Sequence, residues 1–166
     1  MAMQDDVVDG TQWMIDQGYA DKNKICIVGA SYGGFAALAA TVKSPEVYKC
    51  AVSFAGVSDL DRIVRRARGF LGSKLVKKQI GEDGDDRDRR SPINYVENIK
   101  TPILLVHGEE DRVVHVEQSR LMADELDDED KEYRYVELPM GNHHLEIQSN
   151  RIKLFKEMDK FLAEYL

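Results

Sequence analysis

The sequence lacks the features that mark several special classes of protein. No apolar run reaches the roughly 18 residues that a membrane span needs, so the sequence predicts no membrane partner. No repeat and no low-complexity linker interrupts the chain. No signal-peptide pattern opens it, but this says nothing about a longer parent, and the compartment stays unassigned.

Cysteine is scarce as well, with only Cys26 and Cys50. Each lies in or beside a short apolar run, where a cysteine typically behaves as a small hydrophobic side chain. We therefore interpret both as buried hydrophobic residues, which say little about the redox compartment.

What remains is the composition of one ordinary globular domain. The 166 residues fall within the usual size of a domain, and an apolar fraction of 43% is enough for one core. The net charge is −7, and acidic and basic residues are interspersed. This balance argues against binding to nucleic acid or to an anionic membrane as the main task.

Short apolar runs alternate with helical patterns along the chain. The runs are apolar on both faces, which is typical of a parallel sheet covered by helices, so we predict an α/β fold. We expect strands at residues 25–29, 48–54, 102–107 and 133–138, and helices at 5–17, 34–42, 60–79 (one or two, broken near Gly69 and Gly72), 116–126 and 149–166. The charged segment 81–90 is expected to be a surface loop, followed by a turn or short helix from Ser91. The last helix is expected to bury one face, formed by Ile152, Phe155, Met158, Phe161 or Leu162, and Tyr165.

The most informative motif is Gly29-Ala30-Ser31-Tyr32-Gly33. A strand-like run precedes it and a helix of small residues follows, which is the context of a nucleophile elbow. The elbow holds its serine in a strained conformation, and we expect a Cβ at either glycine to collide with a neighbour. Ser31 is therefore the candidate nucleophile, and the amide of Tyr32 would point to the position of an oxyanion.

A nucleophilic serine needs an acid and a base, which α/β-hydrolases supply in the order Ser, Asp or Glu, His. Asp111 follows the third expected strand through a glycine turn and is our candidate acid. Asp59, after the second strand, is the alternative, although we prefer to interpret it as a helix N-cap.

The candidate base lies in the loop after the last expected strand. This loop contains His143 and His144, and spacing alone does not choose between them. His107 ends a strand and is expected to be a buried hydrogen-bonding residue, and His115 is expected to cap or flank the next helix.

Several segments together resemble the prolyl oligopeptidase family of serine peptidases, especially its acylaminoacyl-peptidase and dipeptidyl-peptidase members. The resemblance covers nearly the whole chain and lies in segments 21–35, 91–93, 101–114 and 141–151. It is specific because three separated motifs occur in the right order. The family's catalytic histidine follows a glycine and a polar residue, which places that role on His143 rather than His144.

The resemblance implies a serine hydrolase that cleaves short peptides. Ser31 would attack the carbonyl, His143 would transfer the proton, and Asp111 would orient the imidazole. An oligopeptide or small ester substrate is expected, and no metal or cofactor is implied. The alternatives are a carboxylesterase with the same triad and a catalytically silent half-domain that acts by association.

The resemblance also implies that residues 1–166 form the C-terminal part of an α/β-hydrolase catalytic domain. Family members have several strands before the elbow strand, and usually a β-propeller before those. We therefore expect an exposed sheet edge and either a homo-oligomer or pairing with a missing N-terminal half. Because the loop that gives the second oxyanion donor would precede this chain, we expect weak activity of the isolated chain.

Overall fold

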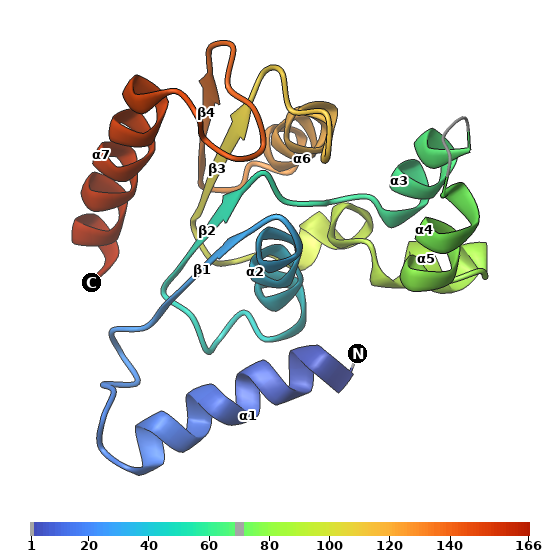
Figure 1. Ribbon diagram of the computed structural model, residues 1–166. Coiled ribbons are helices and arrows are strands. Elements are labelled where there is room, and N and C mark those ends of the chain that lie inside the picture. Colours follow the sequence, from blue (N-terminus) through green and yellow to red (C-terminus); the bar gives the residue numbers. More distant parts are fainter. Residues whose placement is uncertain (1, 69–71) are drawn as a thin grey trace.

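The computed structural model describes residues 2–68 and 72–166 as helices packed on one parallel sheet (Figure 1). Helices and strands alternate as expected for an α/β fold. The elements are α1 (Ala2–Asp16), β1 (Cys26–Ala30), α2 (Tyr32–Lys43), β2 (Cys50–Phe54), α3 (Leu60–Ala67), α4 (Ser73–Ile80), α5 (Gly84–Arg90), the 3-10 helix η1 (Pro92–Asn98), β3 (Ile103–Gly108), α6 (Glu117–Asp128), β4 (Tyr133–Leu138) and α7 (Gln148–Tyr165).

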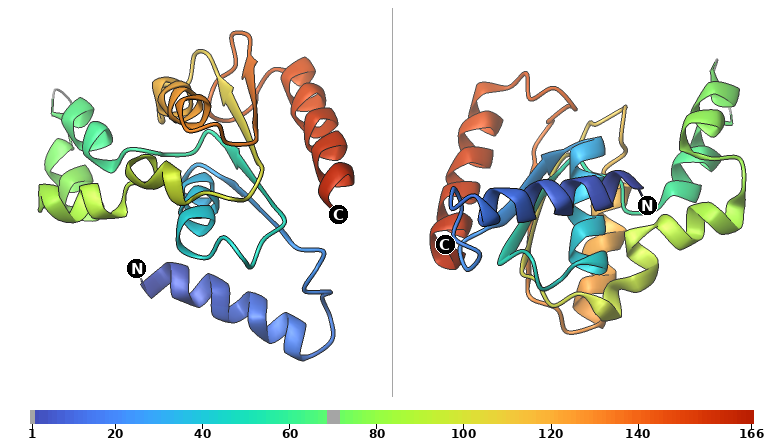
Figure 2. Two further views of the ribbon diagram at one scale, coloured as in Figure 1. Left: turned by 180° about the vertical axis from the view of Figure 1, so that it is seen from behind. Right: turned by 90° about the horizontal axis from the view of Figure 1, so that it is seen from below.

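The four strands are parallel and lie in the order β1-β2-β3-β4. Both faces of the central strands β2 and β3 are buried, as the continuous apolar runs predicted. Helices α2 and α6 cover one face of the sheet, with Leu38 and Met122 in that core, and α7 covers the other with Leu154 and Phe161 (Figures 1 and 2). Helices α3, α4 and α5 form a separate group that follows the carboxyl end of β2. The prediction of a parallel sheet flanked by helices is confirmed.

Two predicted elements are wrong in part. Residues 81–90 contain α5 rather than a loop alone, because Asp83 caps the helix and the buried Arg87 pairs with Asp61 at 2.6 Å. In α7 the buried side chains include Leu154 and Phe161, whereas Ile152 and Phe155 are 49% and 62% exposed. A break in the helical segment 60–79 was expected near Gly69 and Gly72. Gly69 lies outside the described residues. Gly72 does precede α4, with a φ of 99° that a glycine adopts without strain.

Cys50 is buried as expected, but Cys26 is only half-buried and the two form a disulfide, so the interpretation of both as simple buried hydrophobic residues is wrong. The two residues are register partners in the neighbouring strands β1 and β2, and their Cα atoms lie 4.6 Å apart. This distance is within the range that a disulfide can bridge. The cross-link therefore joins the strand before Ser31 to the centre of the sheet.

We predict that reducing this disulfide lowers the free energy of unfolding by about 3 kcal/mol, because it releases a chain constraint between residues 24 positions apart. Urea denaturation with and without reductant measures the difference. A variant with both cysteines changed to alanine should be insensitive to reductant. Equal stability of the oxidised and reduced protein would contradict the prediction.

Strand β1 lies at one edge of the described sheet. Among the described residues it pairs with β2 alone. Val28, in the middle of β1, is 48% exposed. The apolar residues Trp13 and Met14 of the preceding helix are also exposed. An exposed apolar edge was expected, and it is present.

Within the described ranges, no helix has the length and hydropathy that would let it cross a membrane.

Candidate active site

The three candidate side chains follow strands that end at the same edge of the sheet. Ser31 comes directly after β1, Asp111 lies in the turn after β3, and His143 lies in the loop after β4. Because the strands are parallel, their carboxyl ends share one edge, which gathers these segments from far apart in the sequence (Figure 1).

Ser31 has the strained backbone that an elbow requires. Its φ of 55° and ψ of −118° are unusual for a residue with a side chain, and its amide donates to the carbonyl of Phe54 at 2.9 Å. A Cβ at Gly29 would lie 2.0 Å from the carbonyl oxygen of Gly33, so Gly29 is required as expected. A Cβ at Gly33 would meet nothing within 4 Å, so the expected collision at that position is wrong.

The amide of Tyr32 is the first of α2. The first four amides of a helix have no acceptor within the helix, and they lie at its positive end. This amide is therefore in a suitable place to donate to the anion that would form if Ser31 attacked a carbonyl.

His143 and Asp111 contact each other directly. The imidazole Nδ1 lies 2.7 Å from the Asp111 Oδ2, across 32 residues of sequence. His143 is half-buried, whereas the neighbouring His144 is exposed and lies edge-on to the His143 ring. Because the carboxylate accepts the Nδ1 proton, neutral His143 keeps the lone pair of its Nε2, which is the atom that a general base needs.

Asp111 is held as a buried carboxylate. Its Oδ1 accepts hydrogen bonds from the amides of Val113 and Val114, both at 2.9 Å. Burial alone would raise the pKa of Asp111. Hydrogen bonds from His107, His143 and the two amides outweigh it and lower the pKa to about 2.

His107 is a buried hydrogen-bonding residue, as expected. Its Nε2 lies 2.8 Å from the carbonyl of Val114, which can only accept, so Nε2 carries the proton and Nδ1 accepts from the Ser119 hydroxyl at 2.7 Å. The same Nε2 is 3.4 Å from Asp111 Oδ2. His107 thus ties the turn that carries Asp111 to α6.

The structure confirms the N-cap interpretation of Asp59 and the expected position of His115 beside the next helix. Asp59 is the N-cap of α3, where its side chain accepts from the amide of Arg62 at 2.8 Å. His115 flanks α6, and its carbonyl accepts from the amide of Gln118.

A close approach between Gly108 and Gly141 was not predicted from the sequence. A Cβ on Gly108 would lie 2.3 Å from the carbonyl oxygen of Gly141. That carbonyl accepts from the amide of Glu110 at 2.9 Å, and Asn150 donates to the carbonyl of Pro139 at 3.0 Å. The two glycines allow the turn that carries Asp111 to lie against the loop that carries His143. The sequence signal for this contact was the glycine that follows His107 at the end of the strand.

A cavity of about 880 Å³ adjoins Ser31. Its wall is largely apolar, and α1, α2, α3 and the turn after β3 all contribute to it. The lining residues include Tyr32, Phe35, Val57, Leu60, Ile63 and Val114. The volume and lining are suitable for a small side chain or a short peptide segment.

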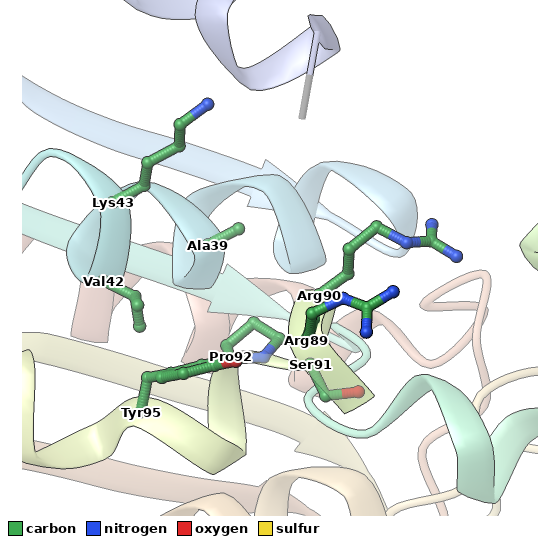
Figure 3. Close-up of a pocket in the computed structure, with 8 residues that line it drawn as sticks. All are labelled: Ala39, Val42, Lys43, Arg89, Arg90, Ser91, Pro92 and Tyr95. Carbon is green, nitrogen blue, oxygen red and sulfur yellow. The ribbon is translucent and has the colours of Figure 1, made fainter. Parts of the chain in front are cut away.

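A second cavity, of about 280 Å³, lies between α2 and the segment 89–95 (Figure 3). Lys43, Arg89 and Arg90 give it a basic lining, but Lys43 pairs with Asp5 and Arg90 pairs with Asp86 at 2.7 Å. Ser91 donates to the carbonyl of Arg87 and accepts from the amide of Leu60. These polar groups already have protein partners, so we assign no ligand to this cavity.

The low pKa of Asp111 predicts a specific pH dependence. A carboxyl whose pKa is lowered in the folded state stabilises the fold above its unfolded pKa, near 3.8, and this stabilisation is lost as pH falls toward 2. The difference in unfolding free energy between wild type and Asp111→Asn should therefore shrink by about 2 kcal/mol between pH 5 and pH 2. Urea denaturation at several pH values measures it, with the exposed Asp128→Asn as control. A difference that does not change with pH would contradict the prediction.

Fold and family agree. The four-stranded parallel sheet, with a strained serine turn after β1, is half of an α/β-hydrolase domain. The family model of the prolyl oligopeptidase family matches residues 2–166, and the chain belongs to this family of serine peptidases.

Relatives and solved structures agree with this assignment. The chain is 27% identical to dipeptidyl aminopeptidase BIII of Pseudoxanthomonas mexicana, over 99% of this chain and 25% of that protein. It superposes with a TM-score of 0.90 on a puromycin-hydrolysing peptidase of Mycobacterium tuberculosis, at 29% identity, covering 98% of this chain and 25% of that one. The acylaminoacyl peptidase of Pyrococcus horikoshii gives a TM-score of 0.87 at 27% identity, covering 98% and 28%. The chain thus spans about a quarter of the length of these proteins.

Proposed function

We propose that this chain carries the catalytic triad of a serine hydrolase that cleaves peptide bonds of short peptides. The observation that carries the proposal is the 2.7 Å contact between His143 and the buried Asp111, at the sheet edge where Ser31 has its strained backbone. Membership of a peptidase family supports the same conclusion.

In this proposal the Ser31 hydroxyl attacks the substrate carbonyl. His143 Nε2 takes the hydroxyl proton and later gives it to the leaving amine. Asp111 keeps the Nδ1 proton of His143 in place and stabilises the imidazolium, and the amide of Tyr32 donates to the oxyanion. The apolar cavity beside Ser31 favours a substrate with an apolar side chain next to the scissile bond.

A fluorophosphonate probe tests the proposal, because it reacts with activated serines. Mass spectrometry of the labelled chain should locate the adduct on Ser31. Comparison of a peptide p-nitroanilide with a p-nitrophenyl ester then separates a peptidase from the alternative, a carboxylesterase with the same triad. A folded chain that does not label would support the silent half-domain instead.

The exposed edge of β1 favours association with a second copy of the chain, or pairing with a further segment of the kind that the longer relatives contain. The expected homo-oligomer remains a prediction, and light scattering at micromolar concentration would test it.

A further inference from the structure

Gln4 is a buried polar residue at the wall of the Ser31 cavity. It is 2% exposed and is the one buried residue of α1. Neither its Nε2 nor its Oε1 has a hydrogen-bond partner among the described residues. Buried side-chain amides are normally paired, so two unpaired atoms of one carboxamide at a cavity wall require an explanation.

The position of Gln4 is fixed by contacts of its own helix. The Tyr32 hydroxyl lies 3.5 Å from the Met3 sulfur, and Lys43 pairs with Asp5 on the other side of Gln4. Further along α1, the hydroxyls of Thr11 and Tyr48 are 3.1 Å apart. The start of α1 is thus attached to α2, and this attachment places Gln4 in the lining of the same cavity as Ser31.

The surroundings of Gln4 determine what it can recognise. The neighbouring wall is apolar, with Phe35, Val57 and Leu60, and the charged groups of Asp86 and Arg90 pair with each other at 2.7 Å. A carboxamide offers N–H donors and a carbonyl acceptor side by side. The complementary group is another amide, which has both an acceptor and a donor, whereas an ester has no donor.

We propose that Gln4 is a substrate-recognition residue that hydrogen-bonds a main-chain amide of the peptide in the Ser31 cavity. The inference rests on the proposed function for its substrate class, and it makes Gln4 a determinant of the preference for peptides over esters.

The test measures binding rather than turnover, so that it does not depend on catalysis. In a Ser31→Ala background, NMR titration gives the Kd of N-acetyl-alanyl-phenylalanine amide and of its depsipeptide, in which an ester oxygen replaces the internal amide N–H. The variant Gln4→Met keeps the length of the side chain without its polar atoms. Gln12→Met is the matched control, because Gln12 is exposed on the same helix and donates to Asp16.

We expect Gln4→Met to weaken peptide binding about tenfold, the size of one lost hydrogen bond, and to weaken depsipeptide binding less. We also expect its melting temperature to be equal to or higher than that of the parent, because an unpaired buried amide is replaced by an apolar group. A merely structural glutamine would instead lower the melting temperature. Unchanged peptide affinity in Gln4→Met, a lowered melting temperature, or no binding to the parent would overturn the proposal.

Fluorophosphonate labelling of the chain with Ser31 intact separates this inference from the proposed function. Failure of labelling together with Gln4-dependent peptide binding would remove the triad proposal and leave the recognition site. Labelling without Gln4-dependent binding would do the reverse.

Discussion

Ser31→Ala is expected to abolish labelling of the chain by a fluorophosphonate probe while leaving the fold intact. The physical reason is that Ser31 combines the strained elbow backbone with a place beside the Tyr32 amide and the large apolar cavity. The loss of one hydroxyl from the lining of a cavity removes little packing, so the circular dichroism spectrum should not change.

The matched control is Ser149→Ala, since Ser149 is an exposed serine in α7. It should label at the wild-type rate. Undiminished labelling of Ser31→Ala, or an adduct on another serine, would show that the nucleophile has been assigned to the wrong residue.

His143→Ala is expected to lower the rate of labelling and of peptide hydrolysis by several orders of magnitude, as removal of a triad member does. His143 contacts the buried Asp111 at 2.7 Å, and in the proposed triad its imidazole is the group that accepts the Ser31 proton. His144→Ala is expected to have a small effect, because that side chain is exposed and its ring packs edge-on against the ring of His143.

The two variants control for each other, because they remove the same side chain from adjacent positions of one loop. Rates of probe labelling, measured together with the melting temperature, separate a loss of chemistry from a loss of folding. If His144→Ala were the damaging change, the alignment with the family's histidine motif would be wrong by one residue.

The local pattern of the sequence was sufficient for most elements of the fold. Apolar runs predicted the central strands β2 and β3 because a strand buried on both faces needs no polar positions, and β4 lies at residues 133–138 as expected although it is only half-buried. The elbow motif predicted the strained conformation of Ser31, since strand, turn and helix are all encoded within a few neighbouring residues. Family motifs in the right order also predicted the α/β-hydrolase fold.

Predictions failed where a distant partner decides the local structure. The charged segment before Arg90 forms α5 because Arg87 pairs with Asp61, which is 26 residues away. In α7 apolar residues lie on more than one side, and only the sheet determines that Leu154 rather than Phe155 is buried.

Neighbouring residues were enough to specify the strands, the helices other than α5, the elbow at Ser31 and the set of candidate acids and bases. Which of these residues contact one another depends on tertiary packing. The order and register of the strands pair Cys26 with Cys50 and align Gly108 of β3 with Leu138 of β4. That alignment brings Asp111 to His143, and the attachment of α1 to α2 buries Gln4 beside Ser31. These contacts join residues far apart in the chain, so their formation depends on the packing of the whole sheet.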